Sequence, residues 1–444
     1  MSESDVTLVF DKENPSVLGV DDSLCIQCGE CVRTCRDVAT VARMYEIDKT
    51  KKPICIGCGQ CILNCPVNAI TEKFDYEIVK KLLKEPDKVV VFSIAPAVRV
   101  ALSEEFGLNP GENVAGKIVT ALKSMGSKYV FDITFGADLT VMEEAMELVN
   151  RLSTKEHLPM FTSCCPSWVK YAEIFYPEML DNLSTCKSPI GMQGTTIKEY
   201  FAKIMNIDKT KLVHVVVAPC TAKKEEILRN VDSNGVKGTD YILTTRELAT
   251  LIKDNNIDFN SLSDTDFDSP LGLGSGAGLI FGSTGGVCEA TLRCVYRLLT
   301  NENLEKEKLD FTKVRGMDGI KEATLDINGK VLKVAVANGM ANAKIIIDKI
   351  KNGKCDYSFV EVMSCPGGCI GGGGQPKSNE DINTVRVKRS QGLYLDDSKN
   401  TRRVCYQNKD IIKVYQDFYV KPGSHIAHEM LHTKFHDQSD ILKG

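Results

Sequence analysis

Short runs of hydrophobic residues recur along the chain after residue 86, separated by stretches with helical spacing. Apolar runs of this length are typical of strands that are buried on both faces. The first run covers residues 89–94 and is followed by a helical segment from Pro96 to about Phe106. Similar runs lie at 129–132, 160–162, 213–218, 240–243, 331–336 and 357–362. Because strands that alternate with helices form mostly parallel sheets, the pattern predicts an α/β fold.

The same pattern predicts how the chain is divided into domains. Residues 85–444 are expected to form a catalytic domain of two α/β lobes with parallel-type sheets and a break near residues 210–235. Glycine-rich stretches at 271–286 and 367–374 are predicted to be loops in which the backbone makes a close approach. Residues 1–80 lack the alternation and are predicted to form a separate, small α+β domain.

One predicted helix, from Asp138 to Leu152, carries acidic residues among mostly apolar neighbours. Glu144 and Glu147 are three residues apart, and Arg151 lies four residues further on, so these side chains share one face. Because a buried carboxylate is costly without a partner or a function, this face is a candidate functional element. On this pattern alone, the simpler interpretation, a solvated stripe with an arginine pair, is favoured. Glu143 is expected to be a surface residue.

Composition and charge restrict the classes of function. The chain has 444 residues, a net charge of -4 and 26% charged residues, which gives no basic footprint for nucleic acid. Residues 1–20 lack the basic and apolar regions of a secretory signal. The longest apolar stretch, 89–98, is about half a membrane span. We therefore expect a cytoplasmic protein of an anaerobic setting that binds neither membrane nor nucleic acid.

Cysteine is the unusual component, with 18 residues, and eight of them form a repeat. Residues 23–31 are echoed by residues 53–61, and each copy continues into a C-x2-C-x2-C-x3-C run that is typical of bacterial ferredoxins with two [4Fe–4S] clusters. The fourth cysteine of each run ligates the other cluster in such proteins. Zinc binding or free thiols are the alternatives. The predicted ligand sets are Cys25, Cys28, Cys31 and Cys65 for one cluster, and Cys55, Cys58, Cys61 and Cys35 for the other.

Three further cysteine loops follow strand-like runs, at 162–168, 218–224 and 363–376. Ligands bind at the carboxyl ends of strands in open α/β sheets. These loops hold one thiol more than a third cubane needs, namely Cys164, Cys165, Cys220, Cys365 and Cys369.

The three loops closely resemble the signature loops of the [FeFe]-hydrogenases, and the resemblance covers the chain from about residue 20. In that family a [4Fe–4S] cubane is joined through a cysteine sulfur to a two-iron unit with carbonyl, cyanide and azadithiolate ligands, and the whole is called the H-cluster. The resemblance implies that Cys165, Cys220 and Cys365 ligate the cubane. It also implies that Cys369 bridges the cubane and the two-iron unit.

The resemblance assigns roles to further residues. Lys223 matches a lysine that hydrogen-bonds a cyanide, and Met363 matches a methionine that packs against the carbonyl ligands. Cys164 matches the thiol that passes protons to and from the bridgehead amine, although it is alternatively a small buried hydrophobe. The matching proton relay continues through Glu144, Ser184 and Glu147, with Arg151.

The chain departs from the best-known pattern of the family at four positions. Ser167 replaces a common Gly, Ala218 a Met, Ala97 a Ser and Ile190 a Gln. The changes remove polar contacts and a thioether near the two-iron unit, and such outer contacts tune a metal site. They indicate a distinct, group B-like subgroup of monomeric type, with its own catalytic bias, rate and oxygen sensitivity.

Six other candidates are predicted to be structural. Five of them are thiols that we interpret as structural: Cys186, Cys288, Cys294, Cys355 and Cys405. Of these, Cys186 is the strongest candidate for a functional role, because it lies two residues after Ser184. Residues 428–432 fit the HExxH pattern of zinc proteases, but no third ligand is obvious, so we read this segment as structural as well.

The resemblance implies reversible oxidation of molecular hydrogen to protons and electrons. Electrons would pass through the two [4Fe–4S] clusters to a ferredoxin or flavodoxin, and maturation proteins would supply the two-iron unit. Two alternatives are a hydrogen sensor and an iron–sulfur scaffold protein. Retention of Cys164 and Lys223, and the lack of a signalling domain, argue for the enzyme.

Overall fold

A computed structural model of the chain describes residues 17–41, 54–229 and 235–443. Parts of three sequence predictions lie outside these residues. They are residues 1–16 of the predicted small domain, Pro53 of the repeat, and part of the predicted break at 210–235. No helix in the described part is long and apolar enough to cross a bilayer.

The first described segment forms a small domain around the cysteine repeat. Strands β1 (Leu18–Val20) and β2 (Ile70–Glu72) pair antiparallel, and the two runs continue into α1 (Glu30–Asp37) and α2 (Gln60–Asn64). Each helix starts after a glycine with a left-handed backbone, Gly29 with φ 76° and Gly59 with φ 67°. Because a side chain is strained in this conformation, glycine allows the chain to turn from the cysteine loop into the helix.

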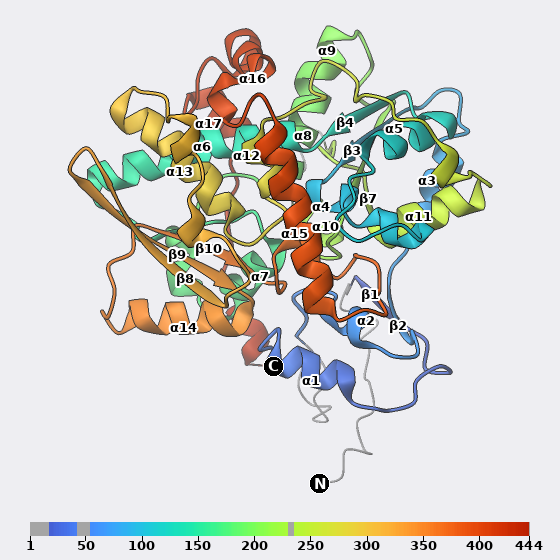
Figure 1. Cartoon of the computed structure of the whole chain (residues 1–444), viewed down its shortest axis with the longest axis horizontal. Helices are drawn as coiled ribbons and strands as arrows, with labels where there is room; N and C mark the ends of the chain where they lie inside the picture. The colour runs from blue at the N-terminus through green and yellow to red at the C-terminus, as the bar shows by residue number, and fades with distance from the viewer. Residues whose placement is uncertain (1–16, 42–53, 230–234, 444) are drawn as a thin grey trace.

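The remaining residues form two four-stranded sheets, which lie side by side above the small domain (Figure 1). The first sheet is entirely parallel and has the order β4-β3-β6-β7. The second has the order β5-β10-β9-β8, in which only β8 is antiparallel to its neighbour. The strands are β3 (Val89–Ile94), β4 (Tyr129–Asp132), β5 (Met160–Phe161), β6 (Leu212–Ala218), β7 (Tyr241–Thr244), β8 (Ile320–Ile327), β9 (Lys330–Asn338) and β10 (Phe359–Met363).

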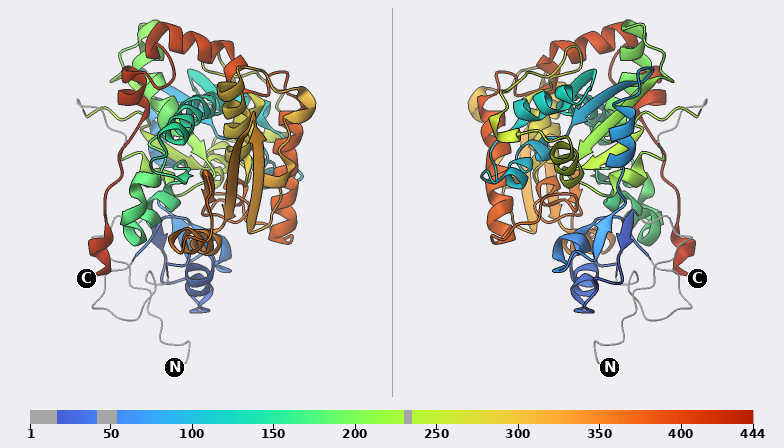
Figure 2. Two further views of the ribbon diagram at one scale, coloured as in Figure 1. Left: turned by 90° about the vertical axis from the view of Figure 1, so that its left-hand side faces the viewer. Right: turned by 90° about the vertical axis from the view of Figure 1, so that its right-hand side faces the viewer.

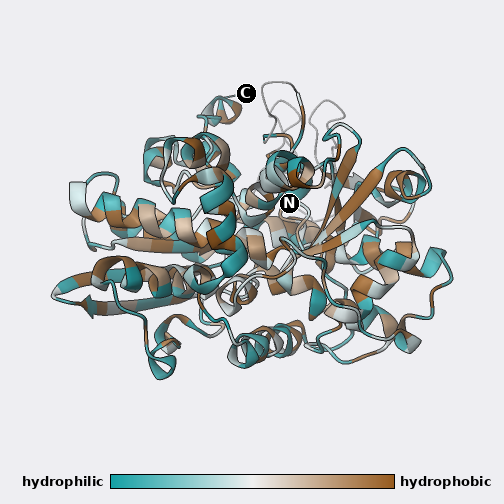
Figure 3. Cartoon of the chain, turned by 90° about the horizontal axis from the view of Figure 1, so that it is seen from above, coloured by the Kyte–Doolittle hydropathy of each residue, from teal (hydrophilic) through white to brown (hydrophobic). Residues whose placement is uncertain are grey.

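Helices cover both sheets and fill the space between them. Hydrophobic residues concentrate on the strands and on inward helix faces, and the outer helix faces are polar (Figure 3). The helices are α3 (Tyr76–Leu82), α4 (Pro96–Arg99), α5 (Ala115–Ser124), α6 (Thr134–Thr154), α7 (Pro166–Phe175), α8 (Pro189–Thr196), α9 (Ala202–Ile204), α10 (Lys223–Glu226), α11 (Thr245–Asp254), α12 (Gly276–Ile280), α13 (Gly286–Thr300), α14 (Met340–Lys351), α15 (Ile382–Lys399), α16 (Lys409–Val414) and α17 (His425–Leu431).

Helix α6 is the longest of these helices and contacts α8, α12 and α13. Packing on several sides explains why its acidic residues are buried rather than solvated. The C-terminal segment after α17 runs down the outside of the molecule toward the level of the small domain (Figure 2).

The predicted α/β class is confirmed, but the predicted break at 210–235 does not divide the sheets. Strand β5 belongs with the later strands, whereas β6 and β7 belong with the early ones. The chain therefore passes between the sheets three times. Hydrophobic runs identify strands, but they do not show to which sheet a crossover helix returns.

Two local expectations are also corrected. The segment 96–106 is not one helix, because α4 ends at Arg99 and a separate 3₁₀ turn covers Leu102–Phe106. Strand β8 was not predicted. Its exposed and buried residues alternate, as expected for an edge strand, and it has no continuous apolar run.

Candidate functional site

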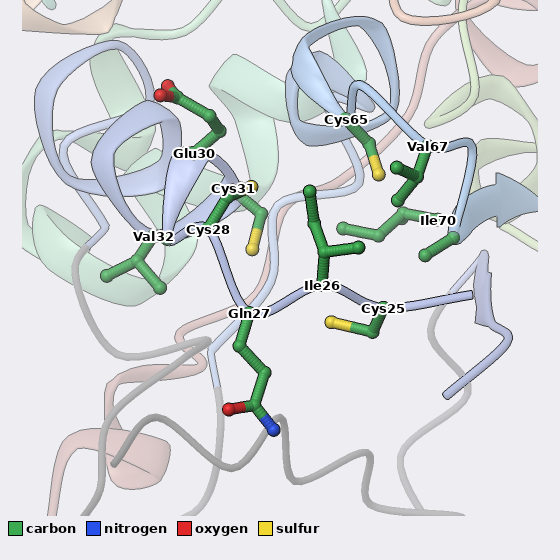
Figure 4. A pocket seen from close by; sticks show the side chains of 12 residues that line it. Cys25, Ile26, Gln27, Cys28, Glu30, Cys31, Val32, Cys65, Val67 and Ile70 are labelled. Atoms are coloured by element: carbon green, nitrogen blue, oxygen red, sulfur yellow. The ribbon is translucent and has the colours of Figure 1, made fainter. Parts of the chain in front are cut away.

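The eight repeat cysteines line two pockets, four in each. The first pocket is lined by Cys25, Cys28, Cys31 and Cys65 (Figure 4). The second is lined by Cys35, Cys55, Cys58 and Cys61. In each pocket one cysteine comes from the other run, as the spacing predicted, and all 18 cysteines of the chain are free of disulfides. Four thiols around one space fit a cubane cluster.

The second pocket lies against the larger part of the molecule. Gln60 donates from Nε2 to the carbonyl of Gly371 at 2.9 Å, and Thr221 donates from Oγ1 to the carbonyl of Gly57 at 2.6 Å. A Cβ atom on Gly373 would lie 2.4 Å from the carbonyl oxygen of Cys58, so glycine is required for this close approach. The first pocket is more outward, and Cys28 is exposed.

The five thiols of the three loops lie at the carboxyl ends of β5, β6 and β10. Cys165 is the residue before helix α7, Cys220 follows β6, and Cys365 follows β10. Burial raises the pKa of Cys220 and of Cys369 to about 12, and for both thiols the proximity of Cys165 adds to the increase. Burial, and then the proximity of Cys220, hold the pKa of the Cys365 thiol well above its usual range. Such mutual repulsion is relieved when thiolates ligate a metal cluster.

Lys223 brings a positive charge to these thiols. Its ammonium group donates to the carbonyl of Cys164 at 3.1 Å and pairs with Glu226 at 2.5 Å. An ammonium group has three donors, so one remains for a ligand. The pKa of Lys223 is raised because its charged neighbours, Glu226 first, outweigh burial.

Met363 and Cys164 pack against the same hydrophobic cluster, at the end of β10. Burial, and then the Glu144 carboxyl group, hold the pKa of the Cys164 thiol well above its usual range. Glu144 is 1% exposed, and burial followed by the charge of Glu147 raises its pKa to about 8. Glu144 is therefore a carboxyl group that both holds and releases a proton near neutral pH.

Next to Glu144 lies a hydrogen-bonded group of Ser184, Glu147 and Arg151, and both Ser184 and Glu147 influence the pKa of Glu144. Ser184 donates from Oγ to Glu147 at 3.0 Å. Arg151 pairs with the other carboxylate oxygen of Glu147 at 2.6 Å. The structure thus brings together all the residues of the predicted relay. The sequence did not identify Thr291, which donates to Glu144 at 3.2 Å, because its helix has no motif that connects it to α6.

Glu143 is not a surface residue, which corrects the prediction. It is 1% exposed and accepts hydrogen bonds from the Tyr415 hydroxyl at 2.5 Å and the Gly423 amide at 2.9 Å. His432 Nε2 lies 3.2 Å from the same carboxylate. The segment after α15 covers this side of α6, and helical spacing on α6 alone gave no sign of that cover.

Comparisons with known proteins agree with this geometry. Residues 88–373 match the profile "Iron only hydrogenase large subunit, C-terminal domain", residues 383–438 match "Iron hydrogenase small subunit", and residues 18–66 match a "4Fe-4S dicluster domain". The chain belongs to the iron-only hydrogenase family.

Individual relatives support the family membership. Iron hydrogenase 1 of Clostridium pasteurianum is 43% identical over 97% of this chain and 78% of that protein. The NADP-reducing hydrogenase subunit HndD of Solidesulfovibrio fructosivorans is 44% identical over 94% of this chain and 74% of that protein. The structure of apo [FeFe]-hydrogenase HydA1 from Chlamydomonas reinhardtii, in a variant form, superposes with a TM-score of 0.72 at 38% identity, over 81% of this chain and 98% of that chain.

A more distant relative belongs to a different functional class. The cytosolic Fe–S cluster assembly factor narfl of Danio rerio is 29% identical over 82% of this chain and 90% of that protein. The fold alone therefore does not separate hydrogen chemistry from cluster assembly.

Membership of the hydrogenase family, together with the dicluster match, gives the cofactors of this chain. They are two accessory [4Fe–4S] clusters and an H-cluster. The two four-thiol pockets and the buried thiols beside Lys223 fit these groups by number and by ligand type.

The four departures from the common hydrogenase pattern are all buried. Ala97 lies in a cluster against which Cys369 packs, and its carbonyl accepts from Gln375 at 2.9 Å. Ile190 and Ala218 belong to another apolar cluster. Ser167 is also buried, in the first turn of α7. Of the four, Ala97 and Ile190 place apolar side chains in buried positions.

The remaining cysteines and the HExxH segment occupy different environments. Cys288, Cys294 and Cys405 are buried, and Cys355 is half-buried. His428 stacks on His432 with ring centroids 4.5 Å apart. Among the described residues, however, no group of close metal-ligating side chains contains both histidines. Cys186 is buried and lies 3.6 Å, Sγ to Oε2, from Glu147.

Proposed function

We propose that this chain is a hydrogenase that catalyses reversible oxidation of hydrogen to protons and electrons. The observation that carries the proposal is the pairing of Cys164 with a buried acidic path. Cys164 directly precedes a candidate ligand. After burial, the charge of Glu144 is the largest influence that raises the pKa of its thiol. A protein that only held a cluster would not need a proton acceptor there.

We assign the ligands by their place in the three loops. Cys165, Cys220 and Cys365 would hold the cubane of the H-cluster, and Cys369 would join it to the two-iron unit. Lys223 and Met363 would contact the ligands of that unit. The H-cluster, when bound, supplies the centre at which the H–H bond is split heterolytically and from which two electrons leave.

The chain's own residues would move the proton. The Cys164 thiol gives its own S–H proton to the carboxylate of Glu144 and takes the new proton at Sγ in its place. The pKa of Glu144, about 8, allows both uptake and release. Ser184, bonded to Glu147 at 3.0 Å, connects the outer carboxylate, and Arg151 holds that carboxylate in place. In the direction of hydrogen production the proton would travel inward along the same groups.

Electrons would leave through the small domain. The pocket of Cys35, Cys55, Cys58 and Cys61 contacts the glycine-rich loop that contains Cys369, so a cluster there would be the proximal one. The pocket with the exposed Cys28 would hold the distal cluster. A ferredoxin or flavodoxin in the cytoplasm is the proposed electron partner, and dedicated maturation proteins would deliver the two-iron unit.

The experiment is hydrogen uptake with a viologen dye under anaerobic conditions, on protein loaded with iron–sulfur clusters and the synthetic two-iron unit. Cys164→Ala is compared with Cys355→Ala, which removes a half-buried thiol that we assign no role. We expect turnover in the wild type and in Cys355→Ala, and its collapse in Cys164→Ala. Equal turnover in all three would refute the proton path. Absence of turnover in fully loaded wild type would favour a sensor or scaffold.

A further inference from the structure

Beside the outer end of the acidic path lies a group of side chains of which the proposed reaction uses only Glu147. We propose that Cys186, His432 and Glu147 form a binding site for a zinc ion. One ligand atom from each residue lies within 4.8 Å of the others. A thiolate, an imidazole and a carboxylate are the ligand types that zinc takes in proteins.

Two segments that are distant in sequence are held together to make this group. The backbone at Cys186 forms an antiparallel bridge with His432. On either side of it, Lys187 donates to the carbonyl of Leu431 at 2.9 Å, and Thr433 donates to that of Thr185 at 2.7 Å. The ligands therefore sit on paired backbone rather than on free loops, which fixes their separation.

Each ligand is also oriented by a neighbour. Arg151 holds Oε1 of Glu147 at 2.6 Å, while Oε2 faces the Cys186 sulfur at 3.6 Å. His432 Nε2 lies 3.2 Å from the buried carboxylate of Glu143, and Nδ1 lies 2.7 Å from the Thr185 hydroxyl. Because a carboxylate accepts only, Nε2 carries the proton and Nδ1 accepts from the Thr185 hydroxyl. Zinc would take the Nδ1 lone pair from that hydroxyl, which is free to rotate away.

A carboxylate that accepts from the outer nitrogen of a histidine is the usual support of a zinc ligand. Glu143 is this carboxylate. Support of His432 is therefore a further role for its buried side chain, besides its hydrogen bonds with Tyr415 and Gly423. Three protein ligands leave a fourth position for water. On binding, zinc replaces the proton of the Cys186 thiol, which is released to solvent.

The site lies near the molecular surface, because Glu147 and His432 are half-buried, whereas Cys186 is buried. A surface pocket next to it is lined by Cys186, Lys187, Thr433, Phe435 and Ser163. Ser163 also bonds the carbonyl of Cys186 at 2.9 Å, so the pocket connects the first cysteine loop to the candidate site.

The consequence for catalysis rests on the proposed function. Glu147 is the outer carboxylate of the proposed proton path, and zinc on Oε2 would occupy the oxygen to which Ser184 donates. A bound dication would also repel protons along the path. Zinc is therefore expected to be a reversible inhibitor of turnover.

The test is zinc K-edge X-ray absorption on holoenzyme supplied with zinc chloride. We expect one sulfur scatterer at about 2.3 Å together with nitrogen and oxygen at about 2.0–2.1 Å. Cys186→Ser should lose the sulfur scatterer. Cys186→Ser and His432→Gln should each weaken zinc binding by at least the roughly 10- to 100-fold that loss of an outer support costs. Cys355→Ser should match the wild type, and the iron content should stay constant throughout.

Zinc-dependent inhibition of hydrogen uptake is measured on the same samples. It should follow zinc occupancy, disappear with chelator and be weakened in Cys186→Ser. Unchanged zinc binding in Cys186→Ser and His432→Gln, or a first shell without sulfur in the wild type, would overturn the site. A sulfur-ligated zinc that leaves turnover unaffected would instead overturn the place of Glu147 in the proton path. The absorption readout does not depend on activity, so the two failures are distinguishable.

Discussion

Glu143 and Glu144 are neighbours in α6 and both are buried, but their surroundings give them different properties. Glu143 accepts three polar contacts, from Tyr415, Gly423 and His432. Glu144 has Thr291 as its donor and sits near the charge of Glu147, so its pKa rises to about 8. The shared face of Glu144 and Glu147 could be predicted from helical spacing. The burial of Glu143 could not, because it depends on a segment about 280 residues away.

Glu144→Gln tests the proton path at a single residue. The amide keeps the shape of the side chain but cannot take up or release a proton, so hydrogen uptake should fall by about 10²- to 10⁴-fold, as for loss of a general acid–base group. Glu173→Gln, which alters a buried carboxylate on α7 that binds Arg229, is the control and should retain activity. Equal activity of the two variants, measured with a viologen dye, would remove Glu144 from the path.

The raised pKa of Glu144 also predicts a pH dependence of stability. Between its ordinary value of 4.5 and about 8, the folded state holds a proton that the unfolded state has lost. The free energy of unfolding contributed by this group is therefore fully present below pH 4.5. It falls as pH rises from 4.5 to about 8 and is lost above that, by an amount on the order of a few kcal/mol in total.

Glu144→Gln should remove this decline. The measurement is the denaturation midpoint of the wild type and the variant at pH 5 and pH 8. The wild type is expected to lose more stability than the variant, and parallel behaviour would show that Glu144 titrates normally.

Among the elements, the strands were predictable where both faces are buried. The runs at 89–94 and 213–218 correspond to β3 and β6, which lie next to each other in the first sheet. The edge strand β8 was missed because its residues alternate between buried and exposed. The membership of β5 in the second sheet could not be predicted either, because its partner β10 lies some 200 residues later.

The contact of the glycine-rich loop with the small domain gives a prediction for an element. In Gly373→Ala the new methyl group would lie 2.4 Å from the Cys58 carbonyl and 2.5 Å from Gly59 Cα, so the two segments must separate. We expect a loss of about 1–3 kcal/mol in stability and slower reduction of viologen. Gly19→Ala is the control, because its Cβ meets nothing closer than 3.5 Å. A Gly373→Ala protein as stable as Gly19→Ala would contradict the close contact.

For the whole molecule, the sequence predicted the two cysteine sets but not their order in space. The exchange of Cys35 and Cys65 between the two runs followed from spacing, and the two pockets match it. Which set faces the H-cluster depends on contacts such as Gln60 with Gly371, and no pattern within the repeat indicates these contacts.

The spatial order predicts that the distal cluster matters for electron exit but not for bond cleavage. Cys28→Ala removes a ligand of the exposed set, so turnover with an external acceptor should drop severalfold or more, whereas hydrogen–deuterium exchange should persist. Cys355→Ala should change neither. Turnover with an external acceptor and hydrogen–deuterium exchange are measured on each variant. Loss of both activities in Cys28→Ala would contradict the proposed electron path through the distal cluster.

We expect this chain to split hydrogen heterolytically at the thiol site of its three cysteine loops. The most direct measurement is formation of HD from D₂ in ordinary water by the fully loaded protein, without an electron acceptor. We predict sustained HD formation, strongly reduced in Cys164→Ala because the proton exchanges through that thiol. If wild-type protein with confirmed two-iron loading forms no HD, this result would contradict heterolytic cleavage. It would indicate a protein that holds clusters without hydrogen turnover.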